Sequence, residues 1–342
     1  MQAMKNVIKF LKAFIFKNRP VYIHYGITHR CNLHCRICKI YQDAKEDEEL
    51  SIGQIEKVFD FLKSLGVVYI SIGGGEPFLR KDLPSVVKLL RRKGFMVRLL
   101  TNATLAKEDS IKKLVSAGLR EISLCLDSLD SQKQDYICNC EGAWEKTKKG
   151  IDLFSNILPK NGRLLLINTV VSAFNIKELP QLSQFAKRMG YFISFVPIEN
   201  NGFSEFTFSL DDYRLIDESY GHLIRMKKEG KNNIFNSSLF LEKSRQYLKS
   251  GQHNWQCDAG KLYFSINPKG ELSICHRFKT VIPLLGSDFK TLFESKEFKN
   301  RRESLIKSCP GCMRPCWAEM SFLFQDKRSF WEMAKIQVAR IK

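Results

Sequence analysis

The sequence of 342 residues contains no long apolar run. No stretch reaches the roughly 18 uninterrupted apolar residues that a membrane-spanning helix needs. The N-terminus also lacks a small-residue cleavage site behind an apolar segment, so no secretion signal is expected. We therefore expect a cytoplasmic protein. The composition, 44% hydrophobic and 27% charged, also excludes a disordered or fibrous chain.

Acidic residues are few compared with basic ones, 36 against 55, which gives a net charge of +19. The basic clusters at residues 91–93 and 299–302 are scattered and do not follow an aromatic-studded surface. A nucleic acid is therefore not expected as a partner. The positive surface instead favours acidic substrates or an acidic partner protein.

Short apolar runs alternate with helical patterns between residues 21 and 200, which is typical of repeated βα units around a parallel sheet. Apolar residues three and four apart, as in Ile52-Ile55-Val58-Phe59-Leu62, mark the helices. Six strands make an incomplete barrel, so the predicted fold class is α/β, a partial (β/α)6 barrel with a small cysteine-rich extension. The strands are expected at Val21–Ile27, Val67–Ile72, Met96–Leu100, Glu121–Leu126, Leu164–Val171 and Phe192–Val196.

Residues 1–20 form a segment of their own, with five Lys or Arg and no acidic residue. The apolar residues Val7, Ile8, Leu11, Phe14 and Ile15 repeat at helical spacing, which predicts a basic amphipathic helix. Such a helix can cap the open end of the barrel, which we favour, or lie on anionic lipid at a membrane surface.

Eleven cysteines in a cytoplasmic chain indicate metal binding or redox chemistry, because disulfides are rare there. One group reads Cys31-Asn-Leu-His-Cys35-Arg-Ile-Cys38, and another includes Cys309-Pro-Gly-Cys312-Met-Arg-Pro-Cys316. Both spacings bring thiolates together. The middle cysteines, Cys125, Cys138 and Cys140, have no regular spacing and are expected to be small buried hydrophobes. Cys125 alternates with Ser123 and Asp127 along a predicted strand, so it could also face the site.

The carboxyl ends of parallel strands form the sites of such folds. The first predicted strand leads into the cysteine loop and the second into Gly73-Gly74-Gly75-Glu76-Pro77. Three cysteines leave one iron of a four-iron cluster open to a ligand. Glycines let a backbone approach a ligand closely, and Glu76 can accept an ammonium group. The loops thus predict an amino-acid-like ligand beside an iron–sulfur cluster.

These two loops, inside a βα repeat, resemble the radical SAM enzymes over residues 21–200. The resemblance implies that Cys31, Cys35 and Cys38 hold a 4Fe-4S cluster, and that S-adenosylmethionine binds its open iron and is cleaved to a 5′-deoxyadenosyl radical. Ile37 would contact the adenine, where an aromatic residue is common in the family. The methionine end would meet Gly74, Gly75 and Glu76, and the ribose or methionyl group would meet Ser123, Asp127 and Asn168. The alternative is that these residues have structural roles only: Gly73 to Gly75 would form a tight strand-to-helix turn, Ser123 and Asp127 would cap the next element, and Asn168 would be an ordinary polar strand residue.

A second module is expected after the barrel. Residues 206–256 would be linker helices, and Tyr263–Ile266 and Glu271–Cys275 flank a turn and predict a hairpin. Residues 257–342 contain a cysteine (Cys257), a glycine (Gly270), four further residues, a cysteine (Cys275) and a later CxxC, and this pattern resembles the SPASM or shorter twitch extension of radical SAM enzymes. The resemblance implies one auxiliary 4Fe-4S cluster; zinc could use the same ligands. The expected metal ligands are Cys257, Cys275, Cys309 and Cys312, with Cys316 as a substitute or spare.

The predicted domains are thus residues 1–20, 21–205, 206–256 and 257–342. The resemblance implies a radical SAM oxidoreductase supplied with electrons by a flavodoxin or ferredoxin, with a peptide, tetrapyrrole, small metabolite or lipid precursor as substrate. The short segment before the first strand weighs against a peptide, and the end in Arg340-Ile341-Lys342 differs from the Gly-Gly end of molybdenum-cofactor cyclases. The alternative is a non-enzymatic iron–sulfur or zinc protein for electron transfer or binding. No residue is predicted to be catalytic.

Overall fold

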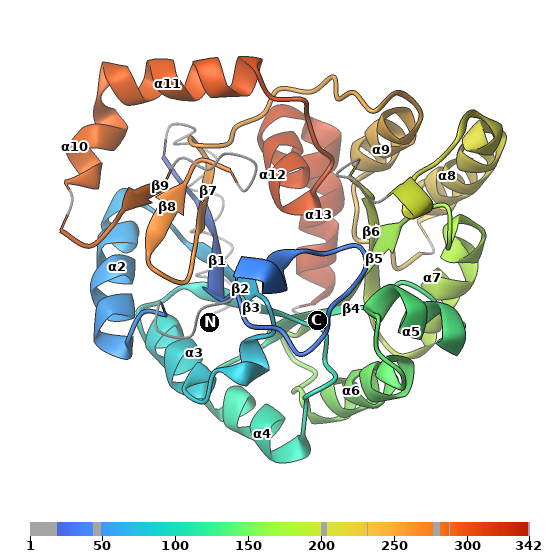
Figure 1. The fold of residues 1–342 in the computed structure, drawn as a ribbon, viewed down its shortest axis with the longest axis horizontal. Coiled ribbons are helices and arrows are strands. Elements are labelled where there is room, and N and C mark those ends of the chain that lie inside the picture. The colour runs from blue at the N-terminus through green and yellow to red at the C-terminus, as the bar shows by residue number, and fades with distance from the viewer. Residues whose placement is uncertain are drawn as a thin grey trace.

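The computed structural model describes residues 19–43, 49–199, 204–230, 232–275, 281–286 and 288–340. Within these residues, nine strands form one sheet in the order β6-β5-β4-β3-β2-β1-β7-β8-β9 (Figure 1). The strands are β1 (Tyr22–Thr28), β2 (Tyr69–Gly74), β3 (Met96–Thr101), β4 (Glu121–Cys125), β5 (Leu164–Val171), β6 (Phe192–Pro197), β7 (Tyr263–Ile266), β8 (Glu271–Ser273) and β9 (Val281–Pro283).

Strands β1 to β6 all run parallel, and each pairs with the next along the chain. Each begins within two residues of the position that the sequence predicts. The fold class is therefore confirmed: the chain is a partial parallel α/β barrel with a smaller extension.

The helices lie on both faces of the curved sheet (Figure 1). Those that connect the parallel strands cover its outer face, while α12 and α13 lie inside its curve. Short 3-10 turns occupy Ile40–Asp43, Pro77–Leu79, Ile176–Glu178, Ser204–Phe206 and Leu210–Asp212. The α-helices are α2 (Ile52–Leu65), α3 (Leu83–Arg92), α4 (Glu108–Ser116), α5 (Ser131–Cys138), α6 (Ala143–Ile157), α7 (Leu179–Arg188), α8 (Tyr213–Glu229), α9 (Ser238–Ser250), α10 (Phe289–Glu294), α11 (Lys296–Lys307), α12 (Pro315–Gln325) and α13 (Lys327–Ala339).

Alternation along β1 shows how one strand serves both faces of the sheet. Tyr25 is fully buried and its ring meets Phe59 of α2 at 5.3 Å, on the outer face. Tyr22 has the opposite orientation and points into the barrel. Its hydroxyl shares a hydrogen bond with the hydroxyl of Ser71 on β2, with 2.6 Å between the two oxygens. Apolar side chains therefore hold the helices outside, while polar side chains line part of the interior.

Both edges of the six-stranded region are covered. Next to β6, the extended segment around Ile234 pairs with Ile193, so part of the backbone of this edge strand is hydrogen-bonded. At the other edge, β7 pairs in parallel with β1, and β8 and β9 follow antiparallel. The predicted hairpin is confirmed, but the sequence did not predict that it extends the barrel sheet.

The hairpin turn between β7 and β8 explains why a glycine, Gly270, stands between Cys257 and Cys275. Gly270 has a φ of +79°, which favours glycine, and its N–H donates to Asn267 O at 3.0 Å. A Cβ on Gly270 would lie 2.9 Å from Leu50 Cδ1. The backbone of Leu50 donates in turn to Pro268 O at 2.9 Å, so the turn is held against the segment that leads into α2.

Helices α12 and α13 fasten the C-terminal region inside the curve of the sheet. Trp317 of α12 stacks on Tyr263 of β7, with ring centroids 4.8 Å apart. At the end of α13, Arg340 Nη2 lies 2.8 Å from Glu121 Oε1 of β4, and both side chains are buried. Burial alone would raise the pKa of Glu121, but the positive charges of Arg340 and Arg98 outweigh it and hold that pKa below its usual value.

Residues 1–18, which contain the expected amphipathic helix, lie outside the described residues, so neither the barrel cap nor the lipid contact is tested. Of the helices in the described ranges, none is both long enough and apolar enough to cross a membrane.

We predict that Arg340→Ala lowers the free energy of unfolding by about 2–3 kcal/mol, because it leaves the buried carboxylate of Glu121 with Arg98 and the Tyr69 hydroxyl as its remaining partners. The loss should shrink as pH falls below about 4, where Glu121 becomes protonated in both states. Chemical denaturation at several pH values measures both effects.

Lys112→Ala, which removes an exposed pair with Glu108, is the control and should leave stability unchanged. Equal stabilities of the Arg340→Ala and Lys112→Ala variants at pH 7 would contradict the assigned role of Arg340.

Candidate metal centre

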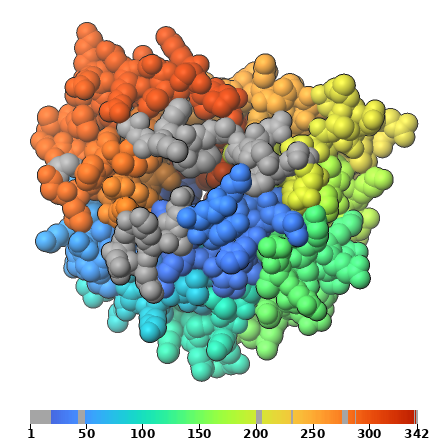
Figure 2. All heavy atoms as spheres, viewed as in Figure 1, coloured from blue at the N-terminus to red at the C-terminus, as the bar shows by residue number. Residues whose placement is uncertain are grey.

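The loop that carries Cys31, Cys35 and Cys38 follows β1 and lies at the centre of the face seen in Figure 2, with α5 beside it. Backbone bonds join this loop to the glycine loop after β2. Gly75 N–H donates to Thr28 O at 2.7 Å, and Glu76 N–H donates to Arg30 O at 2.8 Å.

Two glycines allow this close approach. A Cβ on Gly74, whose φ is +116°, would lie 2.2 Å from Thr28 O. A Cβ on Gly75 would lie 2.0 Å from Arg30 O. Both distances are far below any real contact, so the absence of side chains at Gly74 and Gly75 keeps the cysteine loop in place. The sequence predicts that these glycines let the backbone approach a ligand. In the structure, the segment that they approach closely is the start of the cysteine loop, at Thr28 and Arg30.

The carboxylate of Glu76 is fully buried at the base of these loops. Its Oε1 accepts from Thr101 Oγ1 at 2.7 Å and from Phe78 N–H at 3.0 Å, and its Oε2 accepts from Asn102 N–H at 2.8 Å. Burial raises the pKa of Glu76 to about 7. Three bonds use most of the acceptor positions of a carboxylate, which has about four. One position on Oε2 is left for a further donor.

Asn102, at the end of β3, links the glycine loop to the cysteines. Its Nδ2 donates to Asn32 Oδ1 at 3.0 Å and lies 3.9 Å from Cys31 Sγ. Asn32 in turn donates to Thr104 Oγ1 at 2.8 Å. Asn102 is not among the site residues predicted from the sequence, although its position directly after a parallel strand is a usable signal.

Helix α5 supports the other side of the cysteine loop. Arg36 N–H donates to Ile137 O at 2.9 Å, and Arg36 Nε donates to Tyr136 O at 3.0 Å. The guanidinium also lies 4.2 Å from the centre of the Tyr136 ring. A cation at the carboxyl end of a helix is favourable, because that end carries partial negative charge. The helix therefore positions the loop between Cys35 and Cys38.

The three loop cysteines differ in exposure: Cys38 is exposed, while Cys31 and Cys35 are half-buried. Burial raises the pKa of the Cys31 thiol. A hydrogen bond with Cys138 is the largest cause that raises the pKa of Cys35. Among the described residues, no three His, Cys, Asp or Glu side chains meet at distances that a metal ion requires. The fit of an iron–sulfur cluster therefore rests on the donor set, three thiols on one loop that neighbouring loops hold in place.

The middle cysteines lie closer to this loop than expected. Cys138, at the end of α5, and Cys140 pack with Leu33, Cys31 and Cys35. Cys125, at the end of β4, is exposed and interacts electrostatically with Asp127, Glu76 and Cys38. The sequence contained no signal for the position of Cys138, because about 100 residues separate it from the loop that it contacts.

The other predicted ligand-binding residues surround the same end of the barrel. Ile37 packs with Ile198 and Phe206, beyond the end of β6. Asp127 is buried, its Oδ1 accepts from Val170 N–H at 2.7 Å, and burial raises its pKa to about 7. Asn168 is half-buried and pairs in register with Cys125. Ser123 lies deeper, only 1% exposed.

A second group of cysteines lies beside β7. Cys257 Sγ is 3.3 Å from Tyr263 Oη and within electrostatic range of Cys309, while Cys312 interacts with both Cys257 and Cys275. Burial raises the pKa of Cys257 and of Cys312. Four of the five C-terminal cysteines thus share one region.

Cys316 lies near Arg314 and Glu199, as Cys312 does, and also near Tyr22 of the barrel interior. Burial raises its pKa to about 12. Arg314 Nε donates to Glu199 Oε1 at 2.7 Å and thereby ties the start of α12 to the end of β6. The sequence analysis did not select this ion pair, whose members are 115 residues apart.

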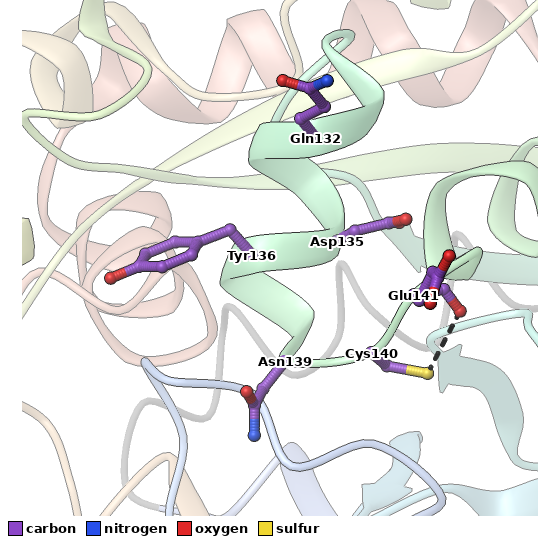
Figure 3. Close-up of a pocket in the computed structure, with 6 residues that line it drawn as sticks. All are labelled: Gln132, Asp135, Tyr136, Asn139, Cys140 and Glu141. Carbon is purple, nitrogen blue, oxygen red and sulfur yellow. Dashed lines mark hydrogen bonds between the residues drawn. The ribbon is translucent and has the colours of Figure 1, made fainter.

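A shallow surface pocket of about 540 Å³ lies along the outer side of α5 (Figure 3). Its lining mixes Asp135 and Glu141 with Tyr136 and Cys140. Asp135 is already engaged, since its carboxylate accepts from the N–H groups of Gly142 and Trp144 at 2.6 and 2.7 Å. Asp135 therefore joins α5 to the start of α6 and is not a free carboxylate of the pocket.

Comparisons with known proteins agree with this geometry. Residues 25–186 match the radical SAM superfamily. An AdoMet-dependent heme synthase of Methanosarcina barkeri is 29% identical over 63% of this chain and 60% of its own length. A GTP 3′,8-cyclase of Thermodesulfovibrio yellowstonii is 32% identical over 64% of this chain and 71% of its own length. The chain thus spans less than two thirds of the heme synthase that it matches.

Solved structures share the fold at low identity. Streptococcus suis SuiB bound to S-adenosylmethionine superposes with a TM-score of 0.67 at 16% identity, over 91% of this chain and 76% of that one. The protein anSMEcpe with bound AdoMet and the Cp18Cys peptide gives 0.63 at 16% identity, over 94% and 98%. The chain belongs to the radical SAM superfamily. Membership implies a 4Fe-4S cluster, S-adenosylmethionine and radical chemistry that depends on it.

We predict that Gly75→Ala destabilises the protein by at least about 2 kcal/mol, since its Cβ would overlap Arg30 O and push the cysteine loop away. Cluster incorporation during anaerobic reconstitution should fall with it. Gly53→Ala is the matched control, because a Cβ there meets nothing within 4 Å and alanine suits a helix. A Gly75→Ala protein as stable as Gly53→Ala would refute the packing argument.

Proposed function

We propose that this chain is a radical SAM oxidoreductase whose first cluster is held by Cys31, Cys35 and Cys38. The observation that supports this most strongly is the convergence of the β1, β2 and β3 loops on the cysteines through Gly75, Glu76 and Asn102. A cluster held by three cysteines has one iron open to S-adenosylmethionine, whose one-electron cleavage supplies a 5′-deoxyadenosyl radical and methionine. That radical takes a hydrogen atom from an organic substrate.

The chain's own residues would bind and orient the cofactor. The last acceptor position of Glu76 suits the methionine ammonium, with Gly74 and Gly75 beside the amino and carboxylate groups. Ile37 forms an apolar wall with Ile198 and Phe206 that suits the adenine. The ribose and methionyl groups would then lie near Asp127 and Asn168. Ser123 is deeply buried and would lie beneath these two residues.

We assign the barrel to residues 21–205, linker helices to 206–256, an auxiliary-cluster module to 257–342, and residues 1–20 to a separate N-terminal segment. Cys257, Cys275, Cys309 and Cys312 would hold one 4Fe-4S cluster, because they share one region beside β7. Cys316 would be a substitute or spare ligand, since it shares the neighbours Arg314 and Glu199 with Cys312 and also lies near Tyr22. The auxiliary cluster can accept the second electron when the substrate is oxidised.

The substrate would be a peptide or a small organic molecule that binds between the two cysteine groups. Structural neighbours include SuiB bound to the precursor peptide SuiA, and sequence relatives include a PqqA peptide cyclase, heme synthase and GTP 3′,8-cyclases. Arg314, with 42% of its side chain exposed, lies near this region and suits an acidic group of the substrate. The net charge of +19 favours an acidic flavodoxin or ferredoxin as the electron donor.

Iron analysis tests the two-cluster assignment. We predict that anaerobically reconstituted protein contains about eight irons, four in each cluster. Replacing Cys31, Cys35 and Cys38 by alanine should leave about four irons and remove the electron paramagnetic resonance signal that changes with S-adenosylmethionine.

Replacing Cys257 and Cys275 should instead keep that signal. Zinc in place of the second set of irons, or a signal sensitive to S-adenosylmethionine without the first three cysteines, would contradict the assignment.

We also predict that Glu76→Gln weakens S-adenosylmethionine binding by about tenfold or more, because the amide removes the negative charge and sets an N–H donor against Asn102 or Phe78. Spectral titration of the reduced cluster measures the affinity.

Glu319→Gln is the matched control, since Glu319 is also a buried glutamate whose pKa burial raises to about 7, but it bonds to Ser237. Equal affinities in the two variants would show that the methionine end is misplaced.

A further inference from the structure

His24 on β1 faces the interior of the barrel, where the proposed function gives it no role. It alternates along the strand with Tyr25, which packs on the outer face, and it is half-buried. Its register partners in the sheet are Ser71 on β2 and Ser265 on β7. The imidazole is therefore a polar group of the inner wall, below the loops that follow β1 and β2.

Two hydroxyl groups fix the direction of the His24 ring. Ser71 Oγ lies 3.0 Å from His24 Nδ1 and 2.6 Å from Tyr22 Oη. A serine hydroxyl donates one hydrogen bond and accepts two, so Ser71 can bond to both neighbours at once. Ser71 and Tyr22 are only 2% and 5% exposed, so water competes little for these bonds. The three side chains form one hydrogen-bonded row along the inner wall.

The ring of His24 meets the glycine loop at its first glycine, Gly73. A Cβ on Gly73 would lie 3.1 Å from His24 Cε1 and 3.4 Å from Leu100 Cβ. The first distance is tighter than ordinary van der Waals contact, so the imidazole occupies the space that a side chain at Gly73 would need. Carbonyls of the cysteine loop fill the corresponding space at Gly74 and Gly75. The three glycines are thus held from two sides.

We propose that His24 is a positioning residue for S-adenosylmethionine: its ring, held by Ser71, supports the glycine loop from inside the barrel and keeps it in the shape that receives the methionine end of the cofactor. This inference rests on the proposed function, because it requires the cofactor to bind at the loop that ends in Glu76. His24 acts through the backbone of Gly73 and not by contact with the cofactor.

The physical reason is the conformational freedom of a run of glycines. Glycine loses more backbone freedom on ordering than any other residue, so three in a row make the loop costly to order. A loop that is already held in its bound shape avoids part of that cost when the ligand binds. Hydrogen bonds to the cysteine loop hold the far end of the run. At the near end Gly73 pairs with Gly26, which also lacks a side chain, so His24 and Leu100 supply the packing.

Titration of the reconstituted, reduced protein with S-adenosylmethionine tests the proposal, with the spectrum of the first cluster as the readout. In His24→Ala we expect the Kd to rise by about fivefold or more, because the loop loses its inner support. In Ser71→Ala, which releases the ring without removing it, we expect a rise of about threefold. His222→Ala is the matched control, since His222 is an exposed histidine on α8 and should leave the Kd unchanged.

A double variant tests whether His24 acts through Gly73. Alanine suits the backbone at Gly73, whose φ is not positive, but its Cβ would press on His24 Cε1. Gly73→Ala alone should therefore raise the Kd by about fivefold or more. In His24→Ala/Gly73→Ala the new methyl group enters the space that the ring has left, so binding should be tighter than in Gly73→Ala alone. Independent roles would instead multiply the two losses.

Hydrogen exchange gives a readout that does not depend on the cofactor. The amides of Gly75 and Glu76 donate to carbonyls of the cysteine loop, so their exchange reports how firmly the glycine loop is held. Without added S-adenosylmethionine, these amides should exchange about threefold faster or more in His24→Ala than in His222→Ala. Exchange in α8, far along the chain from the loop, should be the same in both variants.

Equal Kd values for His24→Ala and His222→Ala would overturn the proposal, and so would a double variant that binds no better than Gly73→Ala. Faster exchange throughout the barrel in His24→Ala would also overturn it, because His24 would then stabilise the whole fold and not the loop. If the wild type itself showed no spectral change with S-adenosylmethionine, the proposed function would fail. Exchange of the loop amides would still show whether His24 holds the glycine loop.

Discussion

The site depends on how closely two backbone segments approach each other at the ends of β1 and β2. The carbonyls of Thr28 and Arg30 occupy the space that side chains on Gly74 and Gly75 would fill. This contact fixes the position of the cysteine loop at the end of the barrel. The same turn places Glu76 where it accepts hydrogen bonds from Thr101 and Asn102. The loops after β1, β2 and β3 are thus joined by contacts between protein residues alone.

The C-terminal module is built onto the same frame. Because β7 pairs directly with β1, the hairpin that leads to Cys275 is part of the sheet that carries Cys31. The stacking of Trp317 on Tyr263 and the ion pair between Arg340 and Glu121 hold α12 and α13 inside the curve of that sheet. The two groups of cysteines are therefore fixed relative to each other, as electron transfer between two clusters would require.

Local patterns predicted the repeating units well, and long-range contacts were the part that they missed. The strand Leu164–Val171 is predicted with its observed bounds, because period and β-branched content are local properties. The pairing of β7 with β1, and the position of Cys138 behind Cys35, join segments roughly 240 and 100 residues apart. No local pattern encodes such contacts. For the same reason, spacing did not indicate that Cys316 lies near Tyr22 of β1.

Formation of 5′-deoxyadenosine tests the central claim most directly. The measurement uses anaerobically reconstituted protein with dithionite and S-adenosylmethionine, and quantifies the product by chromatography. The account predicts product from the wild type and none from Cys31→Ala, whose cluster loop lacks one thiolate. Equal amounts of product from the two proteins, or none from fully iron-loaded wild type with candidate substrates present, would contradict it.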